Sequence, residues 1–211
     1  MASRAVVQQP HWSSKHTTEE DRVRLEEFVV VDRELLKALL ALSKKLGENR
    51  IAGWSLVGDL GEQLLNVNVP ARDISILVER DAFERVIETL RDFNPTRPKE
   101  MEQRLPREAI VEKKRHPVFI RSYKSVVNIS GKTINILSQL QIKIGNMEWG
   151  DVLVFEPAEV NLVGERIRVM PLQLKSELYF SLGWYERVGK IALALFRSQH
   201  HAMRREVRKK N

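Results

Sequence analysis

The stretch Arg72-Asp73-Ile74-Ser75-Ile76-Leu77 decides the fold, together with Gly58-Asp59-Leu60-Gly61 a short distance before it. Apolar and polar side chains alternate in the later stretch, as they do on a strand with one buried face. The alternation predicts a strand over residues 72–79, with Ile74 and Ile76 on one face and Asp73 and Ser75 on the other. An acid and a serine are therefore expected to project from the same side of this strand.

The residues before this strand predict the unit that leads into it. The apolar run from Ile51 to Val57 is typical of a short strand. Gly58 and Gly61 favour a sharp turn into a short helix over residues 62–65, because glycine adopts backbone angles that other residues avoid. The expected order is strand, glycine turn, short helix, strand.

The flanking segments predict helices on both sides of this unit. Thr18, with Asp21 three residues later, indicates a capped helix that carries apolar residues from Leu35 to Leu42 at helical spacing. Asp32 could restart that helix, so one helix and two pieces both stay open. Asp81 is expected to cap a further helix that runs to about Phe93.

The second half of the chain predicts hairpins and then helices. Ser130-Gly131-Lys132 is a hairpin signal between strands at residues 118–129 and 133–137. Further strands are expected at Ile142 and at residues 152–155, 160–163 and 166–170. Pro171 opens a helix that runs to Leu178, and Gly183 separates it from a last helix, which has one apolar stripe made of Trp184, Val188, Ile191 and Leu195.

These elements predict one principal domain with smaller parts at its ends. We expect a flexible leader over residues 1–17, an α+β domain over residues 18–170 and C-terminal helices over residues 171–198, followed by a basic tail at residues 199–211. Residues 94–117 hold four prolines and eleven charges and are expected to form a surface excursion inserted in the domain, with a short helix over residues 108–114 as an alternative.

The composition excludes several classes of protein. The chain has 211 residues, of which 43% are hydrophobic and 30% charged, so it can bury a core. Cysteine is absent, which excludes disulfide bonds, thiolate zinc sites and a cysteine nucleophile. No stretch approaches the roughly 20 apolar residues of a membrane helix, and no secretory signal is visible. The sequence therefore predicts a cytoplasmic protein without a membrane partner.

The positive charge is concentrated in two segments. The net charge is +7. Residues 94–117 carry 7 basic and 4 acidic side chains and residues 197–211 carry 6 and 1, whereas the rest of the chain carries 22 and 23. Such segments attract phosphate-bearing partners in a salt-sensitive way, so a nucleotide or nucleic acid is a possible partner. A basic tail that only keeps the protein soluble is the alternative.

Several common active-site patterns are missing. Gly53 and Gly58 have the spacing of a phosphate-binding P-loop, but Asp59-Leu60 follow where a lysine and a hydroxyl residue are required. The five histidines are scattered, and the adjacent pair His200-His201 points in different directions on a helix, so a histidine metal site is not expected.

The two stretches quoted first resemble the signature of the nucleotidyltransferase superfamily, which has the DNA polymerase beta-like fold. That signature is a strand, a glycine followed by glycine or serine, a helix, and Asp-x-Asp on the next strand, with a third carboxylate from a later strand. Thr133-Ile134-Asn135-Ile136-Leu137 resembles that later strand. Residues 160–182, which include Lys175, are similar to the closing part of the toxin–antitoxin branch, and the resemblance extends from Leu35 to Phe196.

The resemblance implies a fold, a site and a cofactor. The fold would be α+β, a mixed sheet with flanking helices and a C-terminal helical segment. Three carboxylates would hold two magnesium ions that activate a hydroxyl for attack on a triphosphate. By the same resemblance, Gly58, Asp59, Gly61 and Lys175 would form the nucleotide-binding part of the site.

This sequence departs from the signature at the metal-binding positions. Asp73 matches the first carboxylate, but Ser75 and Asn135 stand at the second and third, and Asp59 replaces the usual glycine or serine. Serine and asparagine are neutral, and one carboxylate cannot hold two magnesium ions, so Asp73 is the expected ligand if any magnesium binds. The first hypothesis is therefore a nucleotidyltransferase-like protein with a degenerate metal site that binds a nucleotide or nucleic acid.

Two alternatives stay open. One is an active, metal-dependent nucleotidyltransferase with a rearranged site, in which Asp59 and Glu62 help to bind an ion. The other is a protein-interaction module without a phosphate ligand, whose partner supplies the enzyme. The sequence does not predict the oligomeric state, the substrate or the acceptor.

Overall fold

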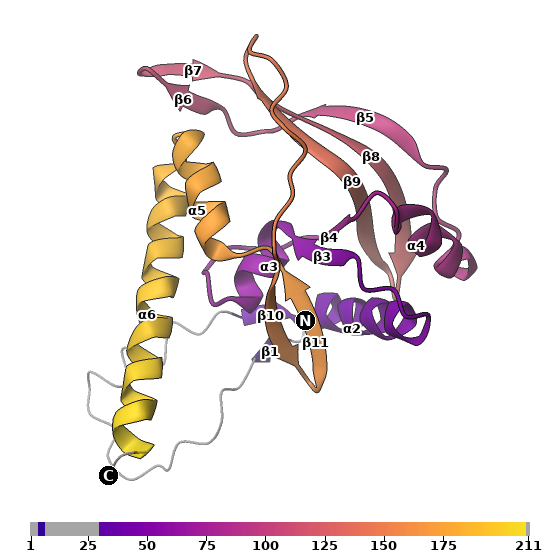
Figure 1. Ribbon diagram of the computed structural model, residues 1–211, viewed down its shortest axis with the longest axis horizontal. Coiled ribbons are helices and arrows are strands. Elements are labelled where there is room, and N and C mark those ends of the chain that lie inside the picture. Colours follow the sequence, from indigo (N-terminus) through magenta and orange to yellow (C-terminus); the bar gives the residue numbers. More distant parts are fainter. Residues whose placement is uncertain (1–3, 7–29, 210–211) are drawn as a thin grey trace.

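The computed structural model describes residues 4–6 and 30–209 of the chain and centres on one mixed sheet of seven strands (Figure 1). The strand order is β10-β11-β3-β4-β9-β8-β5. These strands are β3 (Trp54–Val57), β4 (Ile74–Val78), β5 (Lys99–Arg104), β8 (Val118–Ile129), β9 (Lys132–Ile144), β10 (Ala158–Leu162) and β11 (Glu165–Val169).

Helices and two small strand pairs complete the described fold. The helices are α2 (Arg33–Glu48), α3 (Gly58–Leu64), α4 (Phe83–Thr89), the 3-10 helix η1 (Arg91–Phe93), α5 (Leu172–Ser181) and α6 (Tyr185–Lys209). The pairs are β1 (Arg4–Val6) with β2 (Val30–Asp32), and β6 (Ala109–Val111) with β7 (Lys114–His116). Within the described residues, no helix is both long and apolar enough to cross a membrane.

The centre of the sheet has the predicted unit of strand, glycine turn, short helix and strand. β3 and β4 are antiparallel, and β4 then pairs in parallel with β9, which places Ser75 opposite Asn135. The burial of β4 alternates as the sequence predicts, with Ile74, Ile76 and Val78 in the core. The predicted helix over residues 62–65 begins earlier, at Gly58.

The main core lies between one face of the sheet and α2. Leu35, Leu39, Leu42 and Leu46 of α2 are fully buried against the apolar face of β4 and its neighbours. Asp32 caps α2, since its Oδ1 accepts hydrogen bonds from the amides of Glu34 and Leu35. A helix therefore starts directly after Asp32, whereas the helix expected before it, Thr18 and the leader over residues 1–17 lie outside the described residues apart from β1.

Part of the segment at residues 94–117 joins the sheet as β5, and the rest contains the separate strand pair β6–β7. β5 pairs with β8 as an exposed edge strand, which explains why its charged sequence lacks an apolar period. The alternative helix over residues 108–114 is wrong, because β6 and β7 form a hairpin there. Glu112 and Lys113 make its two-residue turn with positive φ angles, as short hairpins require.

Three further expectations need correction. β9 is one long strand, so the separate strand expected at Ile142 does not exist. The strand expected at residues 152–155 is wrong: this segment follows the outer half of β9 through single hydrogen bonds, such as the one from the Leu153 amide to the Leu140 carbonyl, without a ladder. Asp81 does not cap α4, whose N-cap is Ala82 without a side-chain hydrogen bond.

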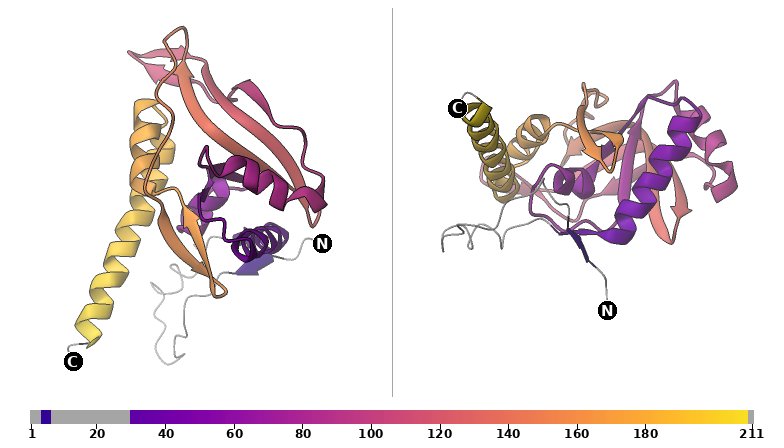
Figure 2. Two further views of the ribbon diagram at one scale, coloured as in Figure 1. Left: turned by 45° about the vertical axis from the view of Figure 1, so that its right-hand side comes forward. Right: turned by 90° about the horizontal axis from the view of Figure 1, so that it is seen from below.

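The C-terminal helices form a layer beside the sheet, far from α2 (Figure 2). Pro171 is the N-cap of α5, so this helix begins where the sequence predicts, although it runs on to Ser181. The segment expected as a basic tail from residue 199 continues the backbone of α6 to Lys209. Ile191 and Ala194 of α6 are buried against Leu172 of α5 and Val67 and Val69 of the loop after α3, so the helices share a second core with the glycine unit.

Candidate nucleotide site

Asp73, Ser75 and Asn135 meet at one edge of the sheet. The Asn135 amide nitrogen (Nδ2) donates to Asp73 Oδ2 at 3.1 Å and to Ser75 Oγ at 3.3 Å. The adjacent, parallel strands β4 and β9 hold the two polar residues opposite each other, and Asp73 stands just before β4. The juxtaposition of these three residues, expected from the family signature, is therefore present. Their roles in binding or catalysis stay predictions.

The glycine turn lies beside this cluster. Gly58 has a φ angle of +73°, which strains any other residue, and a Cβ at this position would lie 3.8 Å from the Cβ of Ser75. Gly61 allows α3 to pack close to β3, since a Cβ there would stand 3.3 Å from the Leu56 carbonyl oxygen. The two glycines thus bring the start of α3 and its free backbone amides next to Asp73 and Ser75.

Two lysines lie on the same side of the sheet. Leu137, two residues after Asn135, faces Lys124 of β8, and Lys124 faces Lys99 of β5. Residues directly opposite in neighbouring strands project to the same side, and so do residues i and i+2 of one strand. Lys99 is exposed and Lys124 is half-buried. The face that carries Asn135 therefore also carries positive charge.

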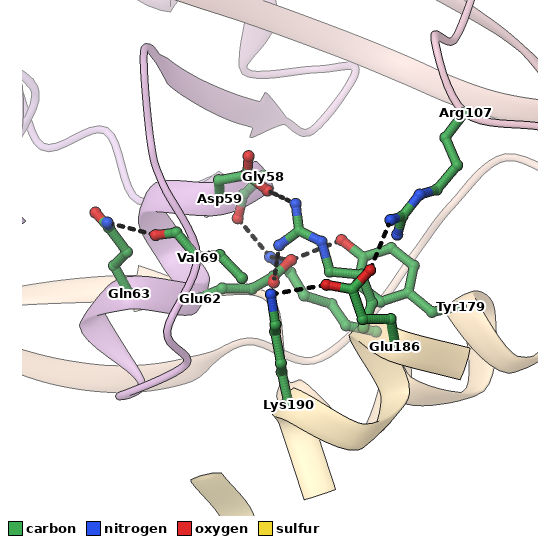
Figure 3. Close-up of polar contacts among 11 residues, drawn as sticks. Gly58, Asp59, Glu62, Gln63, Val69, Arg107, Tyr179, Glu186 and Lys190 are labelled. Carbon is green, nitrogen blue, oxygen red and sulfur yellow. Dashed lines mark hydrogen bonds and ion pairs between the residues drawn. The ribbon is translucent and has the colours of Figure 1, made fainter. Parts of the chain in front are cut away.

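A buried ion-pair network lies under the glycine turn and links it to α5 and α6 (Figure 3). Glu62 of α3 is 0% exposed and Lys175 of α5 is 2% exposed. The Lys175 ammonium donates to the Gly58 carbonyl oxygen at 2.6 Å and to Glu62 Oε1 at 3.3 Å. The turn is thus held by a cation that comes from far along the chain.

Tyr179 and Arg187 complete this network. The Tyr179 hydroxyl donates to Glu62 Oε1 at 2.6 Å, and Arg187 donates to Glu62 Oε2 at 2.9 Å. The second terminal nitrogen of Arg187 donates to Asp59 Oδ1 at 2.7 Å. Both carboxylates of α3 are therefore neutralised by cations of the C-terminal helices.

Burial and charge shift the proton affinities of the network. Burial lowers the pKa of Lys175 below its usual value, although the Glu62 carboxylate opposes this shift. Burial and then the nearby Glu62 carboxylate raise the pKa of the Tyr179 hydroxyl far above its usual range. For Arg187 burial acts against the charged form, but Glu62 and Asp59 outweigh it and raise the pKa. The Tyr179 hydroxyl accordingly remains a hydrogen-bond donor.

The polar groups of the Asp73 cluster do not fit the two magnesium ions that the resemblance implies. They are one carboxylate, one amide and one hydroxyl, and the Asn135 amide nitrogen points at the carboxylate that a metal would need. In the part of the chain that the structure describes, no three histidine, cysteine or acidic residues gather into a group able to hold a metal ion. Asp59 and Glu62 are bound to Arg187 and Lys175.

The structure places the predicted residues in two groups. Gly58, Asp73, Ser75 and Asn135 lie together, whereas Lys175 lies beneath the turn, where its ammonium contacts the Gly58 carbonyl and Glu62. The sequence reasoning missed Tyr179, Arg187 and Lys124. The face of the sheet to which Lys124 projects follows only from the exact strand register. Tyr179 and Arg187 contact α3 only through the tertiary packing of the C-terminal helices.

This chain is similar to known proteins in its structure. Neither a protein-family model nor a curated protein matches the sequence. A solved structure of a candidate nucleotidyltransferase from Thermotoga maritima matches with a TM-score of 0.54 and 20% identity, covering 79% of this chain and 96% of that chain. This chain has the nucleotidyltransferase fold. The α+β class and the arrangement expected from the signature are thereby confirmed.

Two further solved structures are less similar to this chain. The lincosamide antibiotic adenylyltransferase LnuA, bound to lincomycin, has a TM-score of 0.43 and 14% identity over 74% of this chain and 95% of its own. ANT(2″)-Ia, in complex with adenylyl-2″-tobramycin, has a TM-score of 0.43 and 6% identity over 83% and 97%. None of these nucleotidyltransferase-fold proteins bears on the toxin–antitoxin branch, which stays a prediction.

Proposed function

We propose that this nucleotidyltransferase-fold protein binds a nucleotide at the edge formed by Gly58, Asp73 and Asn135, and that it does so without two-metal catalysis. The observation that carries the proposal is the hydrogen bond from the Asn135 amide to Asp73, which replaces a shared metal ion with a direct contact. An amide also cannot take a proton from an attacking hydroxyl at neutral pH.

Cations of the chain contribute to phosphate binding in this proposal. Lys124 and Lys99 lie on the face that carries Asn135, on the third and fourth strands from β3, and would add positive potential there. Asp59, which would otherwise repel a phosphate, has its charge countered by Arg187 at 2.7 Å. Nucleotide binding should therefore weaken with added salt and depend little on magnesium.

The test compares nucleotide affinity with and without magnesium. Each of the four common nucleoside triphosphates is titrated into the wild-type protein, and we expect binding to at least one, with little change on adding magnesium. The double variant Ser75→Asp/Asn135→Asp restores three carboxylates, so its binding should become strongly magnesium-dependent. Ser75→Asn alone, with an uncharged side chain of matching size, should leave the wild-type behaviour.

Two results would contradict the proposal. Magnesium-dependent nucleotide transfer by the wild-type protein, abolished in Asp73→Ala, would identify an active enzyme. Absence of binding to any nucleoside triphosphate at low salt, with a folded protein by circular dichroism, would remove the nucleotide site and favour the interaction module.

One observation favours that interaction module as a second candidate. Leu193 and Phe196 of α6 are 47% and 64% exposed, and Phe180 of α5 is 63% exposed. Exposed apolar side chains on one helical layer are typical of surfaces that contact other proteins. A Leu193→Glu variant that loses a co-purifying partner but keeps nucleotide binding would separate the two functions.

A further inference from the structure

A groove of about 460 Å³ separates the charged segment from the turn between α5 and α6. Arg104 at the end of β5, Arg107 in the following loop and Arg115 of β7 line one side. Trp184 and Tyr185 line the other. Three arginines thus share one groove with two aromatic side chains, and this groove lies outside the Asp73 cluster.

The groove has a fixed floor. The Ile110 amide donates to the Leu182 carbonyl at 2.9 Å, and the Trp184 indole nitrogen donates to the Glu108 carbonyl at 2.7 Å. Gly183 has a φ angle of +68°, and a Cβ there would come within 2.6 Å of the Ile110 carbonyl oxygen. The β6–β7 hairpin is therefore seated directly on the helix turn, and the groove needs no rearrangement to form.

The arginines can exchange their present partners for phosphates. Arg104 pairs with Glu108 and Arg107 with Glu186, each at 3.2 Å and with largely exposed side chains. Exposed ion pairs of this kind contribute little free energy, so a phosphate can compete for the guanidinium groups. Arg115 is exposed, and among the described residues it has no ion pair. One positive charge is therefore free to meet a ligand.

The aromatic side chains offer a surface for bases. Tyr185 is 58% exposed at the groove, a large fraction for an aromatic ring on a structured helix. Trp184 is half-buried, and the Arg107 guanidinium stands 5.7 Å from the centre of its ring. Aromatic and guanidinium planes stack on unpaired bases, whereas a duplex hides its bases from such contacts.

The groove is connected to the glycine turn through the first turn of α6. Glu186 lines the groove, and its neighbour Arg187 pairs with Asp59 directly after Gly58. Figure 3 shows Glu186 with its partners Arg107 and Lys190, on the α6 side of the network that contains Asp59 and Glu62.

We infer that this groove binds single-stranded nucleic acid, with phosphates on Arg107 and Arg115 and a base stacked on Tyr185. The inference deepens the proposed function by assigning a polymeric ligand. It depends on residues distinct from those of the Asp73 cluster, so the two proposals can fail separately.

The test measures fluorescence anisotropy of labelled homopolymeric RNA and DNA oligonucleotides of about a dozen nucleotides, a length within the range of single-strand sites. The full-length protein should bind at least one single strand more tightly than a duplex of the same length. Tyr185→Leu should weaken single-strand binding roughly tenfold through lost stacking, and Tyr185→Phe should not. Arg115→Ala should flatten the slope of log affinity against log salt by about 0.7.

Arg85→Ala is the matched control. Arg85 is an exposed arginine of α4 on the other side of the molecule (Figure 1), so its removal lowers the net charge equally without touching the groove. Equal effects of Arg85→Ala and Arg115→Ala, equal binding of duplex and single strand, or no binding at low salt would each overturn the inference. Groove variants should leave the affinity for a nucleoside triphosphate unchanged, which keeps this result separate from the nucleotide site.

Discussion

At the scale of single residues, the chemistry of the candidate site depends on one amide. Asn135 donates to Asp73 and Ser75, so the cluster is stable without any ion. A carboxylate at the same place would repel Asp73 and would need a cation to lie there. The proposed metal-free binding depends on this difference between asparagine and aspartate.

The residues of this cluster could be predicted from the sequence, but their surroundings could not. Alternation in the strand and the family signature together identified Asp73, Ser75 and Asn135 as neighbours. Lys124 escaped prediction because a shift of one residue in register moves a side chain to the other face of the sheet. The ladder between β8 and β9 also changes register once: between the pairs Tyr123–Ser138 and Arg121–Gln141, β9 has one residue more than β8.

A pH prediction follows from Tyr179. Its pKa is raised in the folded protein, while in the unfolded chain it is about 10. The stabilising contribution is therefore fully present below pH 10 and is lost as the pH rises further, because only the unfolded state then releases the proton. Urea unfolding of the wild type and of Tyr179→Phe should show a difference in unfolding free energy that shrinks above pH 10.

Absorbance near 295 nm checks the same assignment. The chain has three tyrosines. In the folded protein Tyr179 should stay protonated until the alkaline unfolding transition, so its absorbance change should appear together with that transition. If the tyrosine absorbance of the Tyr179→Phe variant shows the same step at the alkaline unfolding transition, the assignment to Tyr179 is wrong.

At the scale of elements, the buried network joins three helices that are distant in the sequence. Glu62 belongs to α3, Lys175 to α5 and Arg187 to α6. Taking two charges out of water is costly, and the cost is offset only where hydrogen bonds satisfy both groups, as they do here. Removal of one partner leaves an unbalanced buried charge.

We expect Lys175→Met to lower the free energy of unfolding by about 3 kcal/mol, the typical loss for a broken buried ion pair. Glu62→Gln/Lys175→Met removes both charges and should recover part of that loss. Chemical denaturation of both single variants and of the double variant measures the coupling between them. Strictly additive losses would mean that the two side chains do not act as a pair.

The elements that the sequence failed to predict are those whose pattern carries no burial signal. β5 reads Lys99-Glu100-Met101-Glu102-Gln103-Arg104 and is almost wholly exposed, so only its pairing with β8 makes it a strand. Residues 152–155 have the opposite property: they are apolar, but they lie alongside β9 without a continuous ladder. The polarity pattern of the sequence predicted the interior strands correctly, because their side chains either alternate between apolar and polar or are buried on both faces.

At the scale of the whole molecule, positive charge lies at two places. One is the groove edge formed by the 94–117 segment, and the other is the end of α6, which extends past the sheet (Figure 2). A polyanion could use either, and the salt dependence of binding counts the phosphates that each contacts.

Deletion of residues 204–211, which removes five basic side chains and one acidic one, should flatten the salt dependence of oligonucleotide binding. The selective loss in Tyr185→Leu should persist in the shortened protein, since base stacking is confined to the groove. Anisotropy titrations between about 50 and 200 mM salt measure both effects. An unchanged slope after the deletion would show that the end of α6 contacts no phosphate.

The bond from Lys175 to the Gly58 carbonyl determines what the smallest working piece of this protein can be. A fragment that stops before residue 171 would keep every signature residue yet lose the tether of the turn where they assemble. The segment that contains the signature residues is therefore shorter than the segment needed to hold them in place. Anyone trimming this protein for crystallography or domain grafting must keep the two last helices with the sheet.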